Sequence, residues 1–250
     1  SSITNDVIWN SGQKINNKGF VNSLTGMIKN TNYEATNDDD YKTNGTINEL
    51  SGVLSFKSSL PLKKERNTFS NIFAPTFMLR YAPGHMRDIS NHDINLKYMN
   101  LYSTNKTSII EDGLSTILGF DFKKNIKQTN GITEEKFSLS MGQVFNLDEN
   151  SDIPSSSSLD QKTSDIVGQM NYNFSKIGNI DYKFSLDHNL NTLNYNEIGT
   201  NLSFSKIDFN INYLEERNHV GEEHYVGGGI SLNLNKSNKL SFETKKNFKT

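Results

Sequence analysis

The chain has 250 residues, of which 34% are apolar and 10% aromatic, with no cysteine and a formal net charge of −2. The lack of cysteine excludes disulfides and thiolate metal sites within this sequence, and the near-zero charge gives no sign of nucleic-acid binding. The mean hydropathy of −0.63 is low for a large buried core, yet the aromatic content argues against disorder. This combination suits β-strands that are polar along one whole face.

Apolar and polar side chains alternate along most of the chain, with the period of a β-strand rather than of a helix. Residues 164–187 are the clearest case, because Met170, Tyr172 and Phe184 alternate with polar neighbours. We predict an all-β antiparallel fold of about twelve strands. In chain order, the expected strands are 3–10, 20–33, 50–62, 72–81, 114–122, 136–145, 165–174, 179–187, 196–204, 207–214, 224–234 and 239–247.

The connections between these strands alternate in length. Short links fall at 63–71, 123–135, 175–178, 205–206 and 235–238, and longer ones fall at 82–113, 146–164, 188–195 and 215–223. Short turns at one end and long loops at the other are typical of an outer-membrane β-barrel. No run approaches the roughly 20 apolar residues of a membrane helix. We therefore expect a transmembrane β-barrel segment.

Charged residues follow the same division. The short links carry basic runs such as KKER at 63–66 and KKNIK at 123–127, whereas the long ones carry acidic runs at 38–40 and 148–152. Solvated turns explain this pattern, and so would acidic loops that share divalent cations with lipid headgroups. The exceptions are Glu134 and Glu135 on the basic side, and Arg80, Arg87 and Arg217 on the acidic side.

Aromatic residues gather near the short links, for example Phe120, Phe122, Phe204 and Phe209. An interfacial girdle of a barrel gives this distribution, and so does the ordinary preference of aromatics for strands. Pro75 interrupts the expected strand 72–81. It marks either a weakened pairing or bulge, or a strand that begins later.

The polar residues that alternate with the apolar rows would line a water-filled lumen, while the apolar rows would meet lipid. The lumen-facing candidates are Asp165, Gln169, Asn171, Asp181, Lys183, Asn201, Asp208, Asn210 and Asn212.

Residue sets that carry chemistry are not found in the sequence. His219 and His224 lie beside Glu222 and Glu223, but solvated loop histidines explain this cluster better than a metal site does. The glycine run 227–229 precedes no helix, so it is not a phosphate loop. We predict no catalytic residue, no metal and no cofactor, and we expect that the protein is not an enzyme.

Five stretches of the sequence carry distinctive features, which are Glu111 and Gly113 at a strand opening, the pair Gly142 and Gln143, and Ser164, Asp165 and Gly168 at a strand start. The stretches are FAPTFMLRYAPGHMRDIS (73–90), EDGLSTILGFDF (111–122), MGQVFNL (141–147), LDQKTSDIVGQMNY (159–172) and YNEIGTNLSF (195–204). Together they resemble the barrel region of LptD, the lipopolysaccharide-assembly protein of the outer membrane.

The resemblance implies a very large barrel in the bacterial outer membrane that transports lipopolysaccharide and releases it sideways into the outer leaflet. It implies no covalent chemistry. The implied partners are lipopolysaccharide, outer-membrane lipids, a plug lipoprotein like LptE and a periplasmic jellyroll bridge like LptA.

The sequence begins SSITNDVIWN, without the pattern of a signal peptide. We expect residues 1–250 to be part of one barrel domain, with the signal, a periplasmic jellyroll and the C-terminal strands outside this sequence. Two alternatives share the strand pattern: an outer-membrane porin or other diffusion channel, and a surface β-protein such as an adhesin.

Overall fold

The computed structural model describes residues 2–34, 45–107, 109–128, 131–174, 177–217, 223–235 and 238–248. Its strands are β1 (Ser2–Asn10), β2 (Lys14–Ile15), β3 (Val21–Tyr33), β4 (Ile47–Ser59), β5 (Leu62–Glu65), β6 (Phe69–Ala82), β7 (Gly113–Lys127), β8 (Thr133–Asn146), β9 (Ile166–Asn173), β10 (Gly178–Leu186), β11 (Leu193–Phe204), β12 (Ile207–Glu216), β13 (His224–Asn233) and β14 (Lys239–Asn247). Helical structure in these ranges is limited to α1 (Tyr98–Leu101) and a 3-10 turn at Ser155–Ser157. Among the described residues there is no helix with the length and apolar character to span a membrane.

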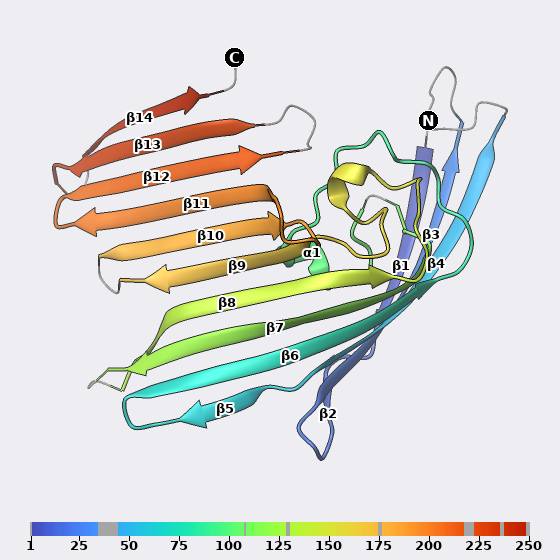
Figure 1. Ribbon diagram of the computed structural model, residues 1–250, viewed down its shortest axis with the longest axis horizontal. Coiled ribbons are helices and arrows are strands. Elements are labelled where there is room, and N and C mark those ends of the chain that lie inside the picture. Colours follow the sequence, from blue (N-terminus) through green and yellow to red (C-terminus); the bar gives the residue numbers. More distant parts are fainter. Residues whose placement is uncertain are drawn as a thin grey trace. The chain divides into compact units, whose positions relative to one another are not determined.

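All strands belong to one antiparallel sheet. Its order is β1-β3-β4-β6-β7-β8-β9-β10-β11-β12-β13-β14, with β2 paired to β3 and β5 paired to β6 (Figure 1). The path does not return from β14 to β1, so the sheet formed by the described residues is open. The predicted all-β antiparallel fold is confirmed. The twelve expected strands make up the path, and the short strands β2 and β5 are additions to it.

The strand β6 includes Pro75 in its interior, at a change of partner. On one side of it Thr76 pairs with Ser59 of β4, and on the other side Phe73 pairs with Leu62 of β5. Proline has no N–H to donate to a ladder, so its position at this junction costs the sheet little. The ladder changes partner at Pro75, and the alternative of a later strand start is wrong, because β6 already begins at Phe69.

Two of the expected short links are partly strand. The strand β7 continues through the basic run to Lys127, and β8 already begins at Thr133, so the link between them shrinks to 128–132. Residues 63–65, expected in a link, lie in β5. The long connections at 83–112 and 147–165 keep nearly their expected lengths. The contrast between these short links and the two longest connections is therefore sharper than predicted, whereas the long link expected at 188–195 shrinks to 187–192.

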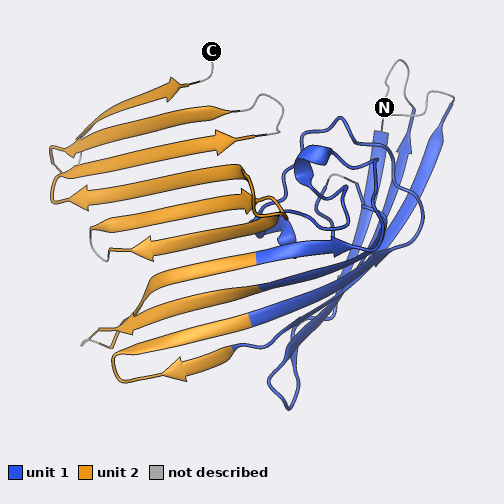
Figure 2. Cartoon of the chain, viewed as in Figure 1, with its two compact units in different colours: residues 1–61, 75–119, 142–165 blue, residues 62–74, 120–141, 166–250 orange. Residues whose placement is uncertain are grey.

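The chain divides into two compact units (Figure 2). Unit 1 comprises residues 1–61, 75–119 and 142–165, and unit 2 comprises residues 62–74, 120–141 and 166–250. Most of the fully buried side chains belong to unit 1, among them Met78, Leu101 and Ile117. Unit 2 consists almost entirely of strands and short connections.

Candidate functional site

In unit 2, the strand register places the predicted polar residues on one face. Gln169 lies opposite Lys183, and Asn171 lies opposite Asp181. Asn201 lies opposite Asn210. Because residues that face each other across an antiparallel ladder point to the same side, these side chains share what we term the polar face. Asp208 and Asn212 join it through their partners in β11 and β13.

Hydrogen bonds tie part of the polar face together. Asn171 Nδ2 donates to Asp181 Oδ1 at 2.6 Å, and Asn179 donates to the other oxygen of Asp181. Lys183 Nζ lies 3.0 Å from Glu197 Oε1. These contacts connect β9, β10 and β11 in a polar ladder, so the face is ordered as well as hydrophilic.

A depression of about 440 Å³ lies on the polar face of unit 2. Asn210 and Asn212 line it together with Gly227, Glu243 and Lys245. The glycine adds no side chain to its floor, and a Cβ at Gly227 would lie 3.7 Å from the Thr244 carbonyl oxygen. This part of the polar face is therefore open to solvent.

The other face of unit 2 is apolar and remains exposed. Ile198 lies opposite Tyr182 on one side and Tyr213 on the other, and Ile230 lies opposite Phe209. We term this the apolar face. It includes Phe209, which keeps 37% of its surface exposed.

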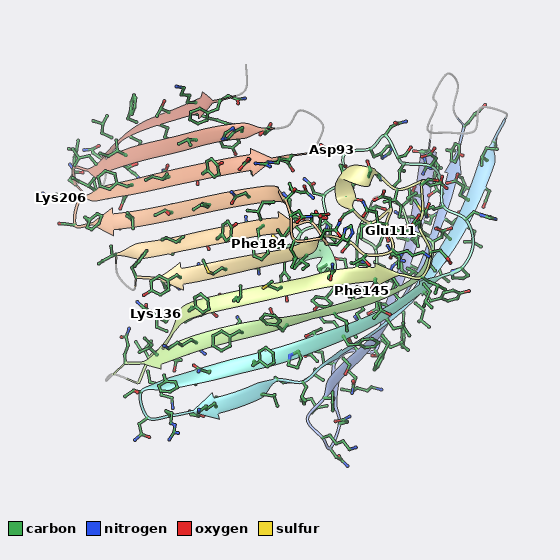
Figure 3. The ribbon with its side chains drawn as sticks, viewed as in Figure 1. Asp93, Glu111, Lys136, Phe145, Phe184 and Lys206 are labelled. Carbon is green, nitrogen blue, oxygen red and sulfur yellow. The ribbon has the colours of Figure 1, made fainter. Side chains whose placement is uncertain are left out.

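Aromatic rings pair across neighbouring strands near the short connections. Phe73 lies with its ring centroid 5.4 Å from that of Phe120, and Phe204 lies 6.3 Å from Phe209. The latter pair flanks the turn that contains Lys206 (Figure 3). The rings thus form a band at the end of the strands where basic residues are frequent.

Unit 1 differs because its long connections cover one face of its strands. In β6 the side chains of Met78 and Ala82 are buried, whereas the alternate residues Phe77, Leu79 and Tyr81 are exposed. The covered face also holds a small apolar cluster made of Met27, Val53, Ala82 and Ile110. The sequence predicted long connections at 82–113 and 146–164, and the structure adds that in unit 1 side chains of both segments are buried, among them Leu101 and Leu159.

A buried ion pair lies at the centre of this packing. Arg80 Nη2 donates to Glu111 Oε2 at 2.8 Å, and both side chains are less than a tenth exposed. Arg80 Nε also donates to the carbonyl oxygen of Thr104 at 2.7 Å, and the backbone N–H of Lys106 donates to Glu111 Oε1 at 2.7 Å. One arginine of β6 thereby binds two points on the connection that follows it.

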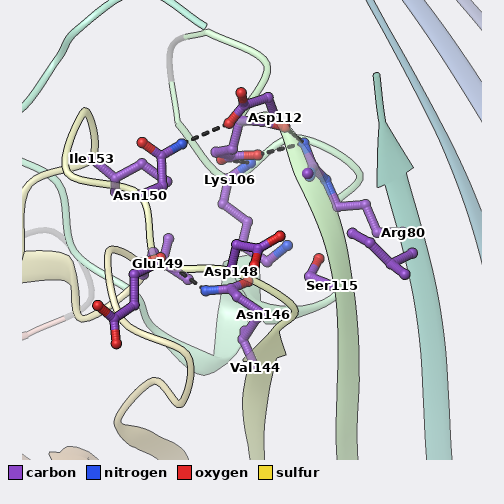
Figure 4. Close-up of a pocket in the computed structure, with 14 residues that line it drawn as sticks. Arg80, Lys106, Asp112, Ser115, Val144, Asn146, Asp148, Glu149, Asn150 and Ile153 are labelled. Carbon is purple, nitrogen blue, oxygen red and sulfur yellow. Dashed lines mark hydrogen bonds and ion pairs between the residues drawn. The ribbon is translucent and has the colours of Figure 1, made fainter. Parts of the chain in front are cut away.

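A cavity of about 270 Å³ lies beside this ion pair (Figure 4). Its lining includes Lys106, Asp112, Asn146 and Asn150. Burial lowers the pKa of Lys106 to about 8. Burial, and then the nearby Asp152 carboxylate, raise the pKa of Asp112. The cavity combines both charge signs, and among the described residues there is no group of three or more His, Cys, Asp or Glu side chains that could hold a metal ion.

The residues that carry the resemblance to LptD hold the long connections in place. A Cβ at Gly142 would lie 2.5 Å from Leu101 Cδ2, so glycine makes room for α1. Gln143 Nε2 donates to the Ser164 carbonyl oxygen at 2.7 Å. Asp165, predicted to face the lumen, is 5% exposed, and its backbone N–H donates to Ser158 Oγ. Asp165 belongs to unit 1, apart from the predicted residues of the polar face.

Most of the charges that break the predicted division have partners of opposite sign. Arg80 pairs with Glu111, Arg87 Nε lies 3.7 Å from Glu49 Oε2, and Arg217 Nη2 lies 2.7 Å from Glu215 Oε1. On the basic side, Lys123 Nζ lies 3.1 Å from Glu135 Oε2, and Glu134 accepts a hydrogen bond from Gln128. The acidic run at 38–40, His219 and Glu222 lie outside the described residues.

Sequence reasoning missed the anchors of the covered face. Ser55, Leu101 and Thr104 were not singled out, although Arg80 already stood out as a basic residue on the acidic side. A usable signal was present, because β4, β6 and β7 carry apolar residues in both alternating rows, for example Met78 beside Leu79. A strand that is apolar on both faces must be covered on both.

Comparison with known families identifies the chain. A family model described as "LptD: LPS transport system D" matches residues 11–237. Among curated proteins no match was found. The match spans nearly the whole open, antiparallel sheet, including both the polar face of unit 2 and the covered face of unit 1. The chain therefore belongs to the LptD family of outer-membrane β-barrel proteins, which transport and assemble lipopolysaccharide at the outer membrane and are not enzymes.

Proposed function

We propose that this sheet forms part of the wall of a lipopolysaccharide-transporting barrel, with the polar face toward a water-filled lumen and the apolar face toward lipid. The observation that supports this most strongly is the register of unit 2, which gathers the amides and carboxylates on one side and the isoleucines and aromatics on the other. Lipid can contact the apolar side chains but not the polar ones, because each polar group without a hydrogen-bond partner in hydrocarbon costs on the order of several kcal/mol.

The proposal also assigns the two ends of the strands. Short turns of outer-membrane barrels lie in the periplasm and long loops lie outside. The short connections such as 128–132 and 205–206 would then be periplasmic, and the aromatic band beside them would lie at the inner interface of the membrane. The long connections at 83–112 and 147–165 would belong to the outer end.

Lateral release and the partners belong to the same proposal. In the part of the chain that the structure describes, the open sheet ends at β1 and β14 without a further strand, and lipid does not tolerate open edges. The proposal therefore includes further strands that close the barrel. Lipopolysaccharide would leave this barrel sideways, between two strands, into the outer leaflet. By family resemblance, a jellyroll bridge like LptA would deliver the substrate, and a lipoprotein like LptE would plug the lumen. The porin and adhesin alternatives lose their support, because the family match favours lipopolysaccharide transport.

A charge placed on each face tests this orientation. We expect that Met170→Arg or Leu186→Arg in the intact protein blocks assembly, because an arginine on the lipid side costs about 2–4 kcal/mol near the membrane centre. Asn171→Arg is the matched control, since it adds the same charge one position away on the polar face, beside Asp181. The measurement is the amount of folded, heat-modifiable protein in the outer membrane. Equal tolerance at Met170 and Asn171 would overturn the orientation.

A further inference from the structure

The strand β5 and the end of β7 carry basic residues at the end of unit 2 where the short connections lie. They belong to the runs KKER at 63–66 and KKNIK at 123–127. The backbone N–H of Lys127 donates to the Thr68 carbonyl oxygen at 2.9 Å, so the turn between β5 and β6 lies against the end of β7. The two basic runs are therefore neighbours at one end of unit 2 (Figure 2).

The strand register divides these cations between the two faces of the sheet. Leu62 lies opposite Phe73, and Lys64 follows Leu62 on the same face, opposite Asn71. The ring centroids of Phe73 and Phe120 lie 5.4 Å apart, so Phe120 belongs to this face too. We term it the ring face.

Lys124 also belongs to the ring face. Side chains alternate along a strand, so Lys124 shares the side of Phe120 and Phe122. At the end of the same strand, Lys127 points to the opposite side, where its Nζ lies 2.5 Å from Glu65 Oε1. The alternation is thus fixed by a contact on each side of Lys124.

On the face opposite the ring face, the basic residues are neutralised within the protein. Lys63 Nζ lies 2.8 Å from Glu65 Oε2, and Lys127 binds the other oxygen of Glu65. Lys123 Nζ lies 3.1 Å from Glu135 Oε2. Each lysine that the two runs place on this face therefore has a carboxylate neighbour.

The basic residues of the ring face lack such neighbours. Within the described ranges, Lys64 and Lys124 have no carboxylate partner, and both side chains are exposed. Arg66, in the turn that follows β5, has no carboxylate partner in those ranges either. The ring face therefore carries a positive charge that an anion from outside can neutralise.

Both lysines lie just beyond the apolar part of the ring face. Lys64 comes two residues after Leu62, and Lys124 comes two residues after Phe122, which is a distance of roughly 7 Å along a strand. Leu62 is 51% exposed and Phe73 is 41% exposed, so these apolar side chains are free to contact lipid. A lysine at such a place lays its stem along the apolar surface and holds its ammonium group among the headgroups.

We propose that Lys64 and Lys124, together with Arg66, form a binding surface for anionic phospholipids of the inner leaflet. The proposal rests on the proposed function, which puts the short connections in the periplasm and the aromatic band at the inner interface of the membrane. Phosphate oxygens accept charge-assisted hydrogen bonds from ammonium and guanidinium groups. The surface prefers phosphatidylglycerol over phosphatidylethanolamine, because the ammonium group of the latter offsets the phosphate charge.

Native mass spectrometry of the intact protein tests this surface. Phosphatidylglycerol and phosphatidylethanolamine are titrated separately into the protein in detergent, and the wild type should bind phosphatidylglycerol more tightly. K64Q/K124Q should weaken phosphatidylglycerol binding by about 25-fold, since each lysine near an anionic membrane surface contributes about fivefold. Binding of phosphatidylethanolamine should not change.

A second double variant provides the matched control. K63Q/K123Q removes the same charge from the adjacent positions, on the opposite face, where both lysines have glutamate partners. It should bind phosphatidylglycerol as the wild type does. Equal weakening in the two double variants would overturn the surface, and so would equal affinity of the wild type for the two phospholipids.

Purified lipopolysaccharide is the third probe, because it also carries phosphate groups. If K64Q/K124Q weakens lipopolysaccharide binding and leaves phosphatidylglycerol binding unchanged, the surface serves the substrate and the inference is wrong. Heat-modifiable migration shows whether each variant is folded. If the double variant is not, Lys64→Gln and Lys124→Gln replace it, each with an expected fivefold effect.

Delivery of lipopolysaccharide to the cell surface, measured in the same strains, separates this inference from the proposed function. A wild-type protein that does not deliver lipopolysaccharide would contradict the proposed function itself. Normal delivery, with phosphatidylglycerol binding that K64Q/K124Q does not weaken, would contradict the phospholipid surface alone.

Discussion

In unit 1, Met78 and Ile117 lie under the long connections and are almost fully buried, whereas in unit 2 Asn210 and Asn212 line an open depression. Both units are built from strands of the same period. The difference lies in the second row of each strand. In unit 1 this row carries buried apolar side chains such as Met78 and Ile117 among small hydroxyl residues and one buried arginine, and in unit 2 it is rich in amides and carboxylates. A polar row needs water, and an apolar row needs a cover, so the sequence of that row decides where the loops pack.

The loss of an ion pair should change the free energy of unfolding far more in unit 1, at Arg80–Glu111, than in unit 2, at Lys183–Glu197. This is the largest difference that we expect between the units. Arg80→Met removes the guanidinium that is hydrogen-bonded to the buried Glu111 carboxylate, which should destabilise unit 1 by about 3–5 kcal/mol. Lys183→Met removes the corresponding partner of Glu197 in unit 2, where both side chains are about a third exposed, and should cost only about 0–1 kcal/mol. The urea midpoint of the intact protein measures both. Similar shifts for the two variants would contradict the contrast between a covered and an open face.

Two glycines sharpen the same comparison with a smaller effect. A Cβ at Gly142 would lie 2.5 Å from Leu101 Cδ2 and 2.8 Å from the Leu118 carbonyl oxygen, so Gly142→Ala should displace α1 at a cost of about 1–3 kcal/mol. The control Gly227→Ala adds its methyl group to the open floor of unit 2 and should be tolerated. Limited proteolysis within 83–107 should become faster in Gly142→Ala alone. Equal protection of the segment in both variants would show that α1 does not depend on this close approach.

The strands of both units were predictable because alternation is a local signal. The polar rows that contain Gln169, Asn171, Asp208 and Asn210 could be recognised from the sequence alone. The strand register places the residues of these rows opposite partners on the same face of the sheet. The strand β5 was missed because Lys63 and its charged neighbours look like a turn. Their strand structure comes from pairing with β6, which the local sequence does not reveal.

The covered face was not predictable in the same way. Leu101 and Thr104 lie in a segment without strand period, and their contacts are with Gly142 and Ser55, which are far away in the sequence. Arg80 was visible as an exception in an acidic region, but its partner Glu111 is separated from it by a long connection. Contacts of this kind follow from the fold and not from a local pattern.

The central claim is that the two faces of unit 2 meet different solvents, and spin-label accessibility tests it most directly. Single cysteines replace Phe209 and Asn210, which are neighbours on β12 and point to opposite faces. In the intact protein in lipid vesicles, the label at Phe209→Cys should be relaxed mainly by oxygen, which concentrates in lipid. The label at Asn210→Cys should be relaxed mainly by a water-soluble nickel chelate. Equal access of the nickel chelate to both positions would contradict the account.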